Sequence, residues 1–339
     1  MKLSLFDYHL DPNKIAQHPS EKRDHSKLLL VDKNTSLMPK NYMFYDLPNL
    51  LSKDDVLVIN NTKVIPARLF GEKTSTGAHI EILLLDEKEP NVYHAMTKPA
   101  KKIQLGDQIK LSDTFKMTCI ALNEDGIRTY QLIYEGILIE QLEALGKLPL
   151  PPYVKALNDD ERYQTIYAKH LGSSAAPTAG LHFTEDIFNQ LKDNGVHVIE
   201  ITLHVGLGTF KPVQTDDITE HHMHEESYLI NEDAVEKLNQ AKQKNKRIIA
   251  VGTTSLRALE SNIKNGQFKA GTFQTSIFIY PGYQFKAIQG LITNFHLPKS
   301  TLLMLVSALT ERTYMLGCYQ YAIDHDYRFF SFGDAMLII

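Results

Sequence analysis

The feature that most constrains the fold is a change of pattern along the chain. From about Val64 to Tyr134, short strand-like runs follow one another with little helix between them. After Leu148, apolar strand-like runs alternate with amphipathic helical segments. Successive short strands are typical of a small antiparallel barrel, and strand–helix alternation is typical of a largely parallel sheet. The sequence therefore predicts a mixed, largely parallel α/β domain with an inserted small antiparallel β-barrel domain.

The domain boundaries are expected at the changes of pattern. The length of 339 residues suits about two domains. Residues 1–62 and 136–339 are expected to form the α/β domain, and residues 63–135 the inserted barrel. The expected barrel strands are Ile80–Leu85, Val92–Met96, Gln108–Leu111, Met117–Leu122 and Thr129–Tyr134, with a hairpin turn at Asn123–Gly126.

Helix signals divide the rest of the chain. Thr184 is a good N-cap before acidic Glu185 and Asp186, and Gly195 is placed to end that helix. Hydrophobic spacing predicts the other elements. They are strands at 56–59, 196–203, 247–251, 276–280 and 287–293, and helices at 232–244, from Thr254 or Ser255, at 299–309 and at 314–324.

Composition limits the classes of function. The net charge of −4 means that any RNA contact needs a local basic patch. The two cysteines, Cys119 and Cys318, lack the spacing of a zinc site or a disulfide framework. The N-terminus has no signal-peptide pattern, and the apolar stretch Thr301–Leu309 is shorter than the ~20 residues that span a membrane. We expect a soluble, cytoplasmic protein with no membrane association.

Polar, glycine-rich segments follow several expected strands, at the ends where α/β sheets bind ligands. Gly252, Thr253, Thr254 and Ser255 lead from a strand into a helix. Backbone N–H groups in such a turn bind carboxylates, phosphates or sugar hydroxyls. Threonine and serine also cap helices that bind no ligand, so plain capping stays open as an alternative.

Two other segments have a similar setting. The segment from His204 to Phe210 has two close glycines, which suit either backbone approach to a ligand or a simple turn, and it lacks the third glycine of a dinucleotide site. The segment from Ala175 to Thr184 suits a ligand-binding loop, or a close-packed connection in which His182 is merely hydrogen-bonded.

A histidine cluster raises the possibility of a metal site. His221 and His224 have a spacing compatible with one helical face, and Glu226 follows them. No distant further ligand accompanies them, so we expect no metal.

Two charged segments leave alternatives open. Lys98, Lys101 and Lys102 suit phosphate contacts or a solvated face. Asp334 could orient a base or bind a ribose hydroxyl, and it could equally be a buried carboxylate held by Arg328.

Taken in order, the motifs resemble one family, the S-adenosylmethionine:tRNA ribosyltransferase-isomerases of queuosine biosynthesis. The resemblance extends from about residue 4 to the C-terminus. Its motifs are FDYHL, RDHSKLL, NNTKVIPARLFG, KPAKKIQLGD, LPLPPYV, RYQTIYA, AAPTAGLHFT, HVGLGTFKPV, AVGTTSLRALE, FIYPGY, TNFHLPKSTL and YRFFSFGDAM.

The resemblance implies a reaction and its partners. The ribosyl part of S-adenosylmethionine, a co-substrate, would be transferred to 7-aminomethyl-7-deazaguanine at the tRNA wobble position and rearranged. The product would be epoxyqueuosine in tRNA, with adenine and methionine released. The resemblance also implies an α/β domain carrying an inserted β-barrel and requires no metal, and we expect a monomer or a homodimer.

This chemistry requires a general base, and the histidines in glycine-rich settings are the candidates. We expect catalytic roles for His182 or His204, with Asp334 as a further catalytic residue. The expected substrate-binding residues are Thr178, Gly180, Gly206, Gly208, Thr209, Gly252, Thr253, Thr254, Ser255, Arg257, Asn294 and His296. The expected tRNA-binding residues are Arg23, Lys63, Arg68, Lys98, Lys101 and Lys102.

Two rival classes of protein compete with this interpretation. One is a metal-dependent hydrolase built on His221, His224 and Glu226. The other is a non-catalytic RNA-binding protein, which the acidic net charge and the polar strand ends disfavour. Release of adenine from S-adenosylmethionine in the presence of precursor tRNA would distinguish the three.

Overall fold

An α/β unit and a closed β-barrel share the chain. The computed structural model describes residues 1–339 except 36, 124–125, 152, 155–158, 207–212 and 214. The α/β unit comprises Met1–Thr62, Tyr153–His170 and Ala176–Ile339, and the barrel unit comprises Lys63–Pro152 and Leu171–Ala175. The predicted fold class, an α/β domain with an inserted antiparallel barrel, is confirmed.

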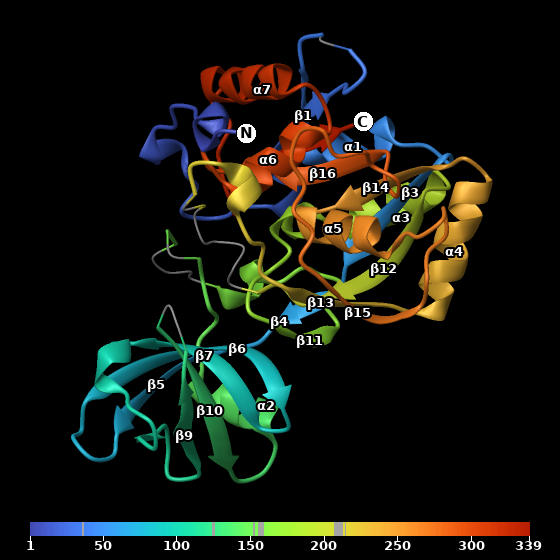
Figure 1. Ribbon diagram of the computed structural model, residues 1–339. Coiled ribbons are helices and arrows are strands. Elements are labelled where there is room, and N and C mark those ends of the chain that lie inside the picture. Colours follow the sequence, from blue (N-terminus) through green and yellow to red (C-terminus); the bar gives the residue numbers. More distant parts are fainter. Residues whose placement is uncertain (36, 124–125, 152, 155–158, 207–212, 214) are drawn as a thin grey trace. The chain divides into compact units, whose positions relative to one another are not determined.

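The α/β unit is built on a nine-stranded sheet in the order β15-β13-β12-β3-β14-β16-β17-β1-β2. Its centre is parallel, because β12 pairs with β3, β3 with β14, and β14 with β16 in the same direction. These four central strands lie side by side in Figure 1. The strands are β1 (Lys27–Val31), β2 (Lys40–Met43), β3 (Asp55–Asn60), β12 (His197–Leu203), β13 (Glu226–Ile230), β14 (Arg247–Val251), β15 (Gly271–Thr275), β16 (Gly290–Asn294) and β17 (Ala335–Ile338).

The helices begin where the sequence provides caps. Thr184 accepts a hydrogen bond from the N–H of Ile187 and starts α3, as predicted, and Asn231 caps α4 in the same way. The helices of this unit are α1 (Leu47–Leu50), α3 (Glu185–Asp193), α4 (Glu232–Gln243), α5 (Thr253–Asn262), α6 (Thr301–Ala308) and α7 (Arg312–Asp324). Within the described ranges, no helix combines the length and the apolar character needed to cross a bilayer.

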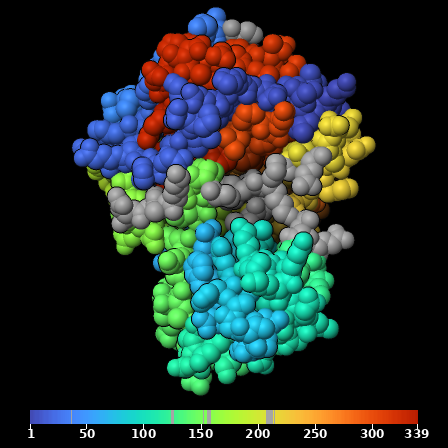
Figure 2. All heavy atoms as spheres, turned by 90° about the vertical axis from the view of Figure 1, so that its left-hand side faces the viewer, coloured from blue at the N-terminus to red at the C-terminus, as the bar shows by residue number. Residues whose placement is uncertain are grey.

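The N-terminal segment packs against the C-terminal part of the same unit. Lys14 donates to Asp326, Arg312 donates to the carbonyl of Leu5, and Ile15 forms a β-bridge with Phe329. Figure 2 shows this contact as the dark blue segment lying against red and orange atoms. The first residues of the chain therefore help to build the region around Arg328 and Asp334.

The barrel unit closes in the order β10-β7-β6-β5-β8-β9, with every pairing antiparallel. Its interior is packed with aliphatic and aromatic side chains such as Ile82, Phe115 and Leu132. The elements are β5 (Arg68–Lys73), β6 (His79–Glu89), β7 (Val92–Lys98), β8 (Gln108–Lys110), β9 (Phe115–Leu122), β10 (Ile127–Tyr134) and helix α2 (Leu138–Leu145). Two connecting strands, β4 (Thr62–Val64) and β11 (His170–Ser173), pair with each other.

The second boundary of the barrel unit differs from the expected residue 135. Residues 136–152 belong to the barrel unit, because α2 buries Leu142 against the barrel core. Residues 171–175 also belong to it. The sequence pattern predicts where the last barrel strand ends, but it does not show that the next helix, α2, packs on the barrel core.

Two strand predictions are corrected by the structure. A strand is expected at 276–280, but the structure has strand β15 just before it, at Gly271–Thr275. Within the expected range, the backbone carbonyl of Ile277 accepts a hydrogen bond from the buried side chain of Arg257. Strand β5 was not predicted, because its sequence RLFGEK contains charges and a glycine. Gly71 is required there, since a Cβ would lie 2.7 Å from the carbonyl oxygen of Lys110. Of the expected hairpin turn, Glu124 and Asp125 lie outside the described residues.

Candidate functional site

The strand-end segments singled out from the sequence meet at one edge of the sheet. β3, β12, β14 and β16 are parallel, so their carboxyl ends lie at the same edge. A cleft there, which we call the strand-end cleft, is lined by Ala176, Pro177, Thr178, Ala179, Val205, Gly252, Thr253, Thr254, Thr293, Asn294, Phe295, His296, Leu302, Phe330 and Ser331. Six of the predicted substrate-binding residues are among them: Thr178, Gly252, Thr253, Thr254, Asn294 and His296.

Gly252 and Thr254, which follow β14, line one side of the cleft. Gly252 precedes α5 with a φ of +87°, a conformation that favours glycine. The hydroxyl oxygen of Thr254 is buried and has no hydrogen-bond partner within the described residues. Buried hydroxyls are nearly always paired in native proteins, so an unpaired one in a cleft indicates a place for a ligand or water atom.

A chain of hydrogen bonds runs from the cleft into the core. The Thr178 hydroxyl donates to Oδ1 of Asn294 at 2.8 Å, and Nδ2 of Asn294 lies 3.2 Å from Nε2 of His182. Nδ1 of His182 lies 2.7 Å from Oγ of Ser26. Because the amide donates to Nε2, the imidazole proton is on Nδ1 and is donated to Ser26. The Thr178 hydroxyl has then used its proton, so its oxygen is left as an acceptor at the cleft.

His182 is enclosed at the inner end of this chain. Its ring is buried and stacks on Phe44 at a centroid distance of 5.0 Å. Burial, with a smaller contribution from Arg328, lowers the pKa of His182 to about 3. The imidazole is therefore neutral near pH 7, and both its nitrogens are already hydrogen-bonded. This arrangement suits a residue that orients Asn294 better than one that takes a proton from a substrate.

His204 has a different environment at the end of β12. Its Nδ1 lies 2.8 Å from the hydroxyl of Thr62, and that hydroxyl donates to the carbonyl of His170 at 3.4 Å. In the tautomer that matches this donation, Nδ1 carries the proton and Nε2 keeps its lone pair. Nε2 has no partner in the part of the chain that the structure describes. Burial, followed by the effect of His170, lowers the pKa of His204. His204 does not line the strand-end cleft, whereas the next residue, Val205, does.

Other predicted substrate-binding residues are placed elsewhere. The Ser255 hydroxyl donates to the carbonyl of Val251, which is a contact within the strand–helix turn. Arg257 is buried and pairs with Glu226 and the carbonyl of Ile277. A Cβ on Gly180 would lie 1.9 Å from the hydroxyl of Tyr167, so this glycine is needed for packing. Gly206 is described but does not line the cleft, and Gly208 and Thr209 lie outside the described residues.

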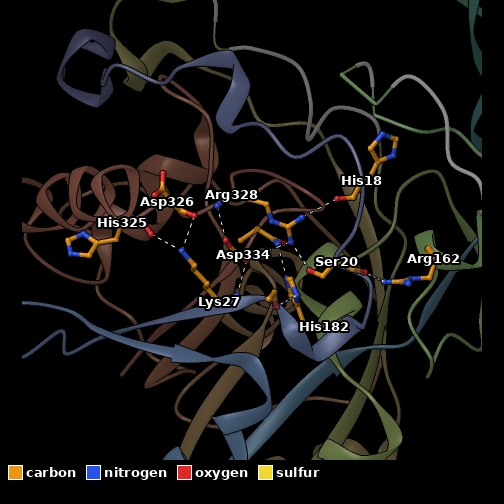
Figure 3. A network of polar contacts seen from close by, with 11 residues as sticks. His18, Ser20, Lys27, Arg162, His182, His325, Asp326, Arg328 and Asp334 are labelled. Carbon is orange, nitrogen blue, oxygen red and sulfur yellow. Dashed lines mark hydrogen bonds and ion pairs between the residues drawn. The ribbon is translucent and has the colours of Figure 1, made fainter.

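Asp334 is held as a buried carboxylate, which is one of the alternatives left open by the sequence. It accepts hydrogen bonds from the N–H of Lys27 at 2.9 Å and of Arg328 at 2.7 Å, and the Arg328 guanidinium lies 3.8 Å away. Burial raises its pKa, and these partners lower it in part. Figure 3 shows the carboxylate between Lys27 and Arg328. Asp334 therefore fixes the start of β1 to the C-terminal segment.

The histidine cluster around His221 does not assemble as a metal site within the described residues. The ring of His221 packs edge-on against Phe278 at 5.3 Å, and Glu226 faces Arg257. Among the described residues, no group of three or more histidine, cysteine, aspartate or glutamate side chains is arranged to hold a metal ion.

The predicted tRNA-binding residues are divided between the units. Lys98 ends β7 of the barrel unit, and Lys101 and Lys102 follow on a short 3₁₀ helix, all three exposed. Lys63 and Arg68 belong to the same unit, and Arg68 donates to the carbonyl of Leu150. Arg23 belongs to the α/β unit.

Sequence reasoning missed several polar residues that shape the site. Asn60 is buried and binds both backbone groups of Leu203, which locks the end of β3 to the end of β12. Ser26 is hydrogen-bonded to His182, and Ser331 lines the strand-end cleft. Asn60 and Ser26 lie in the motifs NNTK and RDHSKLL, but a single polar residue next to a strand carries no signal of its own.

A largely apolar cleft with a few hydroxyl, amide and imidazole side chains lies beside the glycine-capped start of α5, at the carboxyl ends of parallel strands. This arrangement is typical of α/β proteins that bind ligands at a sheet edge. A family model described as Queuosine biosynthesis protein matches residues 3–338, and the chain belongs to this family.

Known proteins resemble the chain over its full length. A protein of Staphylococcus epidermidis (strain ATCC 12228 / FDA PCI 1200) named S-adenosylmethionine:tRNA ribosyltransferase-isomerase is 52% identical, with 100% of both chains covered. A protein of Finegoldia magna with the same name is 51% identical, over 100% of this chain and 98% of its own. The crystal structure of an S-adenosylmethionine tRNA ribosyltransferase from Thermotoga maritima is similar with a TM-score of 0.58 and 35% identity, over 99% of this chain and 100% of that one.

Proposed function

We infer that this chain transfers and isomerises the ribosyl moiety of S-adenosylmethionine onto 7-aminomethyl-7-deazaguanine at the wobble position of tRNA. The product is epoxyqueuosine-tRNA, and adenine and methionine are released. The observation that carries this conclusion is the match to the family and to its named members over the whole chain. The test is incubation with S-adenosylmethionine and precursor tRNA. Adenine should be released only when both are present, and tRNA should gain the ribosyl carbons.

We propose that the strand-end cleft holds the ribose and methionine part of the co-substrate. Thr178 offers an acceptor whose direction is set by Asn294, and Thr254 offers an unpaired buried hydroxyl. Both suit the hydroxyls of a ribose. Rearrangement of the sugar requires these hydroxyls to be held in one geometry, because misplacement of reacting atoms raises the barrier steeply.

We propose that His204 is the general base and that His182 is a positioning residue. The sulfonium acidifies the hydrogens on the ribose carbon beside it, and a neutral imidazole with an available lone pair can remove one. His204 supplies that lone pair from Nε2 and directly precedes Val205, which lines the strand-end cleft, whereas both nitrogens of His182 are engaged. His182 acts through Asn294 on the Thr178 hydroxyl.

Removing the Thr254 hydroxyl should weaken co-substrate binding. We expect Thr254→Ala to raise the dissociation constant of S-adenosylmethionine by about fivefold, because a hydrogen bond to a ligand contributes roughly 1 kcal/mol. The measurement is isothermal titration calorimetry without tRNA. Thr254→Ser keeps the hydroxyl and should bind nearly as the unmodified protein does. An unchanged affinity in Thr254→Ala would remove this residue from the site.

The lysines of the barrel unit are proposed to contact tRNA phosphates. Replacing Lys98, Lys101 and Lys102 together with alanine should weaken tRNA binding. It should also flatten the dependence of log affinity on log salt by about 2, since each phosphate contact contributes roughly 0.7–0.9. Fluorescence anisotropy at several salt concentrations measures both. The control replaces Lys237, Lys242 and Lys244, at and beside α4, and should leave the slope unchanged. An unaltered slope in the barrel variant would contradict the proposal.

S-adenosylmethionine and tRNA are the substrates that the names of the relatives specify. We propose that the reaction takes place in the cytoplasm, where tRNA is modified. The absence of a metal requirement and the choice between monomer and homodimer stay predictions.

A further inference from the structure

Two arginine side chains meet at a second, smaller cleft of the α/β unit. Arg23 comes from the segment before β1, and Arg162 comes from the 3₁₀ helix Asp160–Tyr163. The cleft is lined by Pro19, Ser20, Arg23, Arg162, Leu181, His182, Ser331 and Phe332. Ser331 also lines the strand-end cleft, so the two clefts are neighbours.

Both guanidinium groups are anchored by backbone carbonyls. Arg23 donates to the carbonyls of Leu181 at 3.2 Å and Glu161 at 3.0 Å. Arg162 donates to those of Glu21 at 2.9 Å and Ser20 at 2.6 Å. Within the described residues, neither guanidinium has a carboxylate oxygen within 4.0 Å. Carbonyls fix the position of a guanidinium but do not neutralise its charge.

The charge of this pair is only partly balanced by its surroundings. The pKa of Arg23 is lowered first by burial and then by Arg162, while the more distant carboxylates of Asp159 and Glu161 raise it. Nε of Arg162 is buried and has no acceptor in the described part of the chain. A buried donor without a partner, beside a second cation, is the arrangement that a bound anion completes.

Arg328 holds Ser20 at the edge of this cleft, and its own charge is largely balanced by Asp334. Its guanidinium donates to the Ser20 hydroxyl at 2.6 Å and is balanced by Asp334 at 3.8 Å. Ser20 thus receives one hydrogen bond from Arg328 and another from Arg162, which Figure 3 shows. His182 lines the same cleft as a neutral ring and adds no competing charge.

We propose that Arg23 and Arg162 bind one oxyanion of the substrates, either a backbone phosphate of the tRNA or the carboxylate of S-adenosylmethionine. The proposal rests on the proposed function, since it takes the oxyanion from those two substrates. Planar guanidiniums bind phosphates and carboxylates through paired N–H groups, and the two residues supply such groups at one place. The space inside, about 20 Å³, holds an oxygen atom or two, so the rest of the group stays outside the cleft.

The test measures the two substrates separately in the full-length protein. Arg162→Gln should weaken one of two affinities by about tenfold to a hundredfold, as loss of a hydrogen bond to a charged group does. Loss of tRNA affinity with unchanged S-adenosylmethionine affinity identifies a phosphate. The opposite result identifies the carboxylate. Arg162→Lys, which keeps the charge and loses the planar fork, should give a smaller loss in the same affinity.

Arg312→Gln is the matched control, because Arg312 is a half-buried arginine that also donates to a backbone carbonyl. It should change neither affinity.

If Arg162→Gln does not fold, a second measurement tests the proposal, namely the effect of inorganic phosphate on the melting temperature at constant ionic strength. Phosphate should raise the melting temperature of the unmodified protein above its value in chloride, and should do so less for Arg162→Lys. Unchanged affinities in folded Arg162→Gln, or no phosphate effect on the unmodified protein, would overturn the proposal. Failure of the proposed function would differ, since the unmodified protein would then release no adenine.

Discussion

Replacing His204 with alanine is expected to lower the turnover number by about 10²–10⁴, the usual contribution of a general base. The reason is the lone pair on Nε2, which the contact of Nδ1 with Thr62 leaves available. The burial that lowers the pKa of His204 keeps the ring neutral at pH 7. A base works in its neutral form, so kcat/KM should fall only as the pH drops below the ordinary histidine pKa of about 6.5. Adenine release under saturating substrates gives the turnover number.

The control for this prediction is a histidine of β12, the strand that His204 follows. His197 begins β12 at the opposite edge of the sheet and is exposed, so His197→Ala should keep full activity. His182→Asn should lower activity and also weaken S-adenosylmethionine binding, because it disturbs Asn294 and Thr178, yet the acid limb of the pH profile should stay in place. Near-normal turnover in folded His204→Ala would end its assignment as the base.

Breaking the buried ion pair between Arg257 and Glu226 is expected to destabilise the α/β unit. Both side chains are almost completely buried, at 3–4% exposure. Glu226→Ala leaves the Arg257 charge uncompensated in the interior. We therefore expect the free energy of unfolding to fall by about 3–5 kcal/mol. Urea denaturation measures this change.

A double variant and an exposed pair test the reason for that loss. Glu226→Gln with Arg257→Met removes both charges and should recover part of the stability. Asp233→Ala breaks the exposed pair with Lys237 on α4 and should cost about 0.5 kcal/mol or less. The affinity of folded Arg257→Met for S-adenosylmethionine should be unchanged, since Arg257 does not reach the strand-end cleft. A small loss of stability in Glu226→Ala together with a large loss of affinity in Arg257→Met would instead make Arg257 a ligand residue.

The candidate site could be predicted from the sequence only as segments. Gly252, Thr253 and Thr254 were identified because a glycine followed by hydroxyl residues after an apolar strand is a local signal. Arg257 lies in the same motif, one helical turn further on, and its side chain turns to Glu226, which is 31 positions away. Spacing along the sequence predicts which residues lie on the same helical turn. It does not predict which distant residue a long side chain contacts. For this reason the sequence predicts Arg257 as a substrate-binding residue.

The two histidines illustrate the same limit. Both lie beside glycines in similar segments, so the sequence could not separate their roles. His182 meets Ser26, 156 positions away, and Asn294, 112 positions away, and these contacts occupy both ring nitrogens. His204 meets Thr62 with one nitrogen only. Burial and hydrogen-bond partners decide whether an imidazole can take a proton, and both are set by the tertiary structure.

The change of pattern after Val64 and again after Leu148 was sufficient to predict an α/β domain with an inserted barrel, because hydrophobic periodicity and turn residues are local properties of the chain. The caps at Thr184 and Asn231 are local in the same sense. Only the tertiary structure decided that α2 belongs to the barrel, that Gly252, Asn294 and Thr178 meet in one cleft, and that Arg23 and Arg162 meet beside it. Those contacts join residues tens to hundreds of positions apart, and their formation depends on which surfaces bury each other when the whole chain folds.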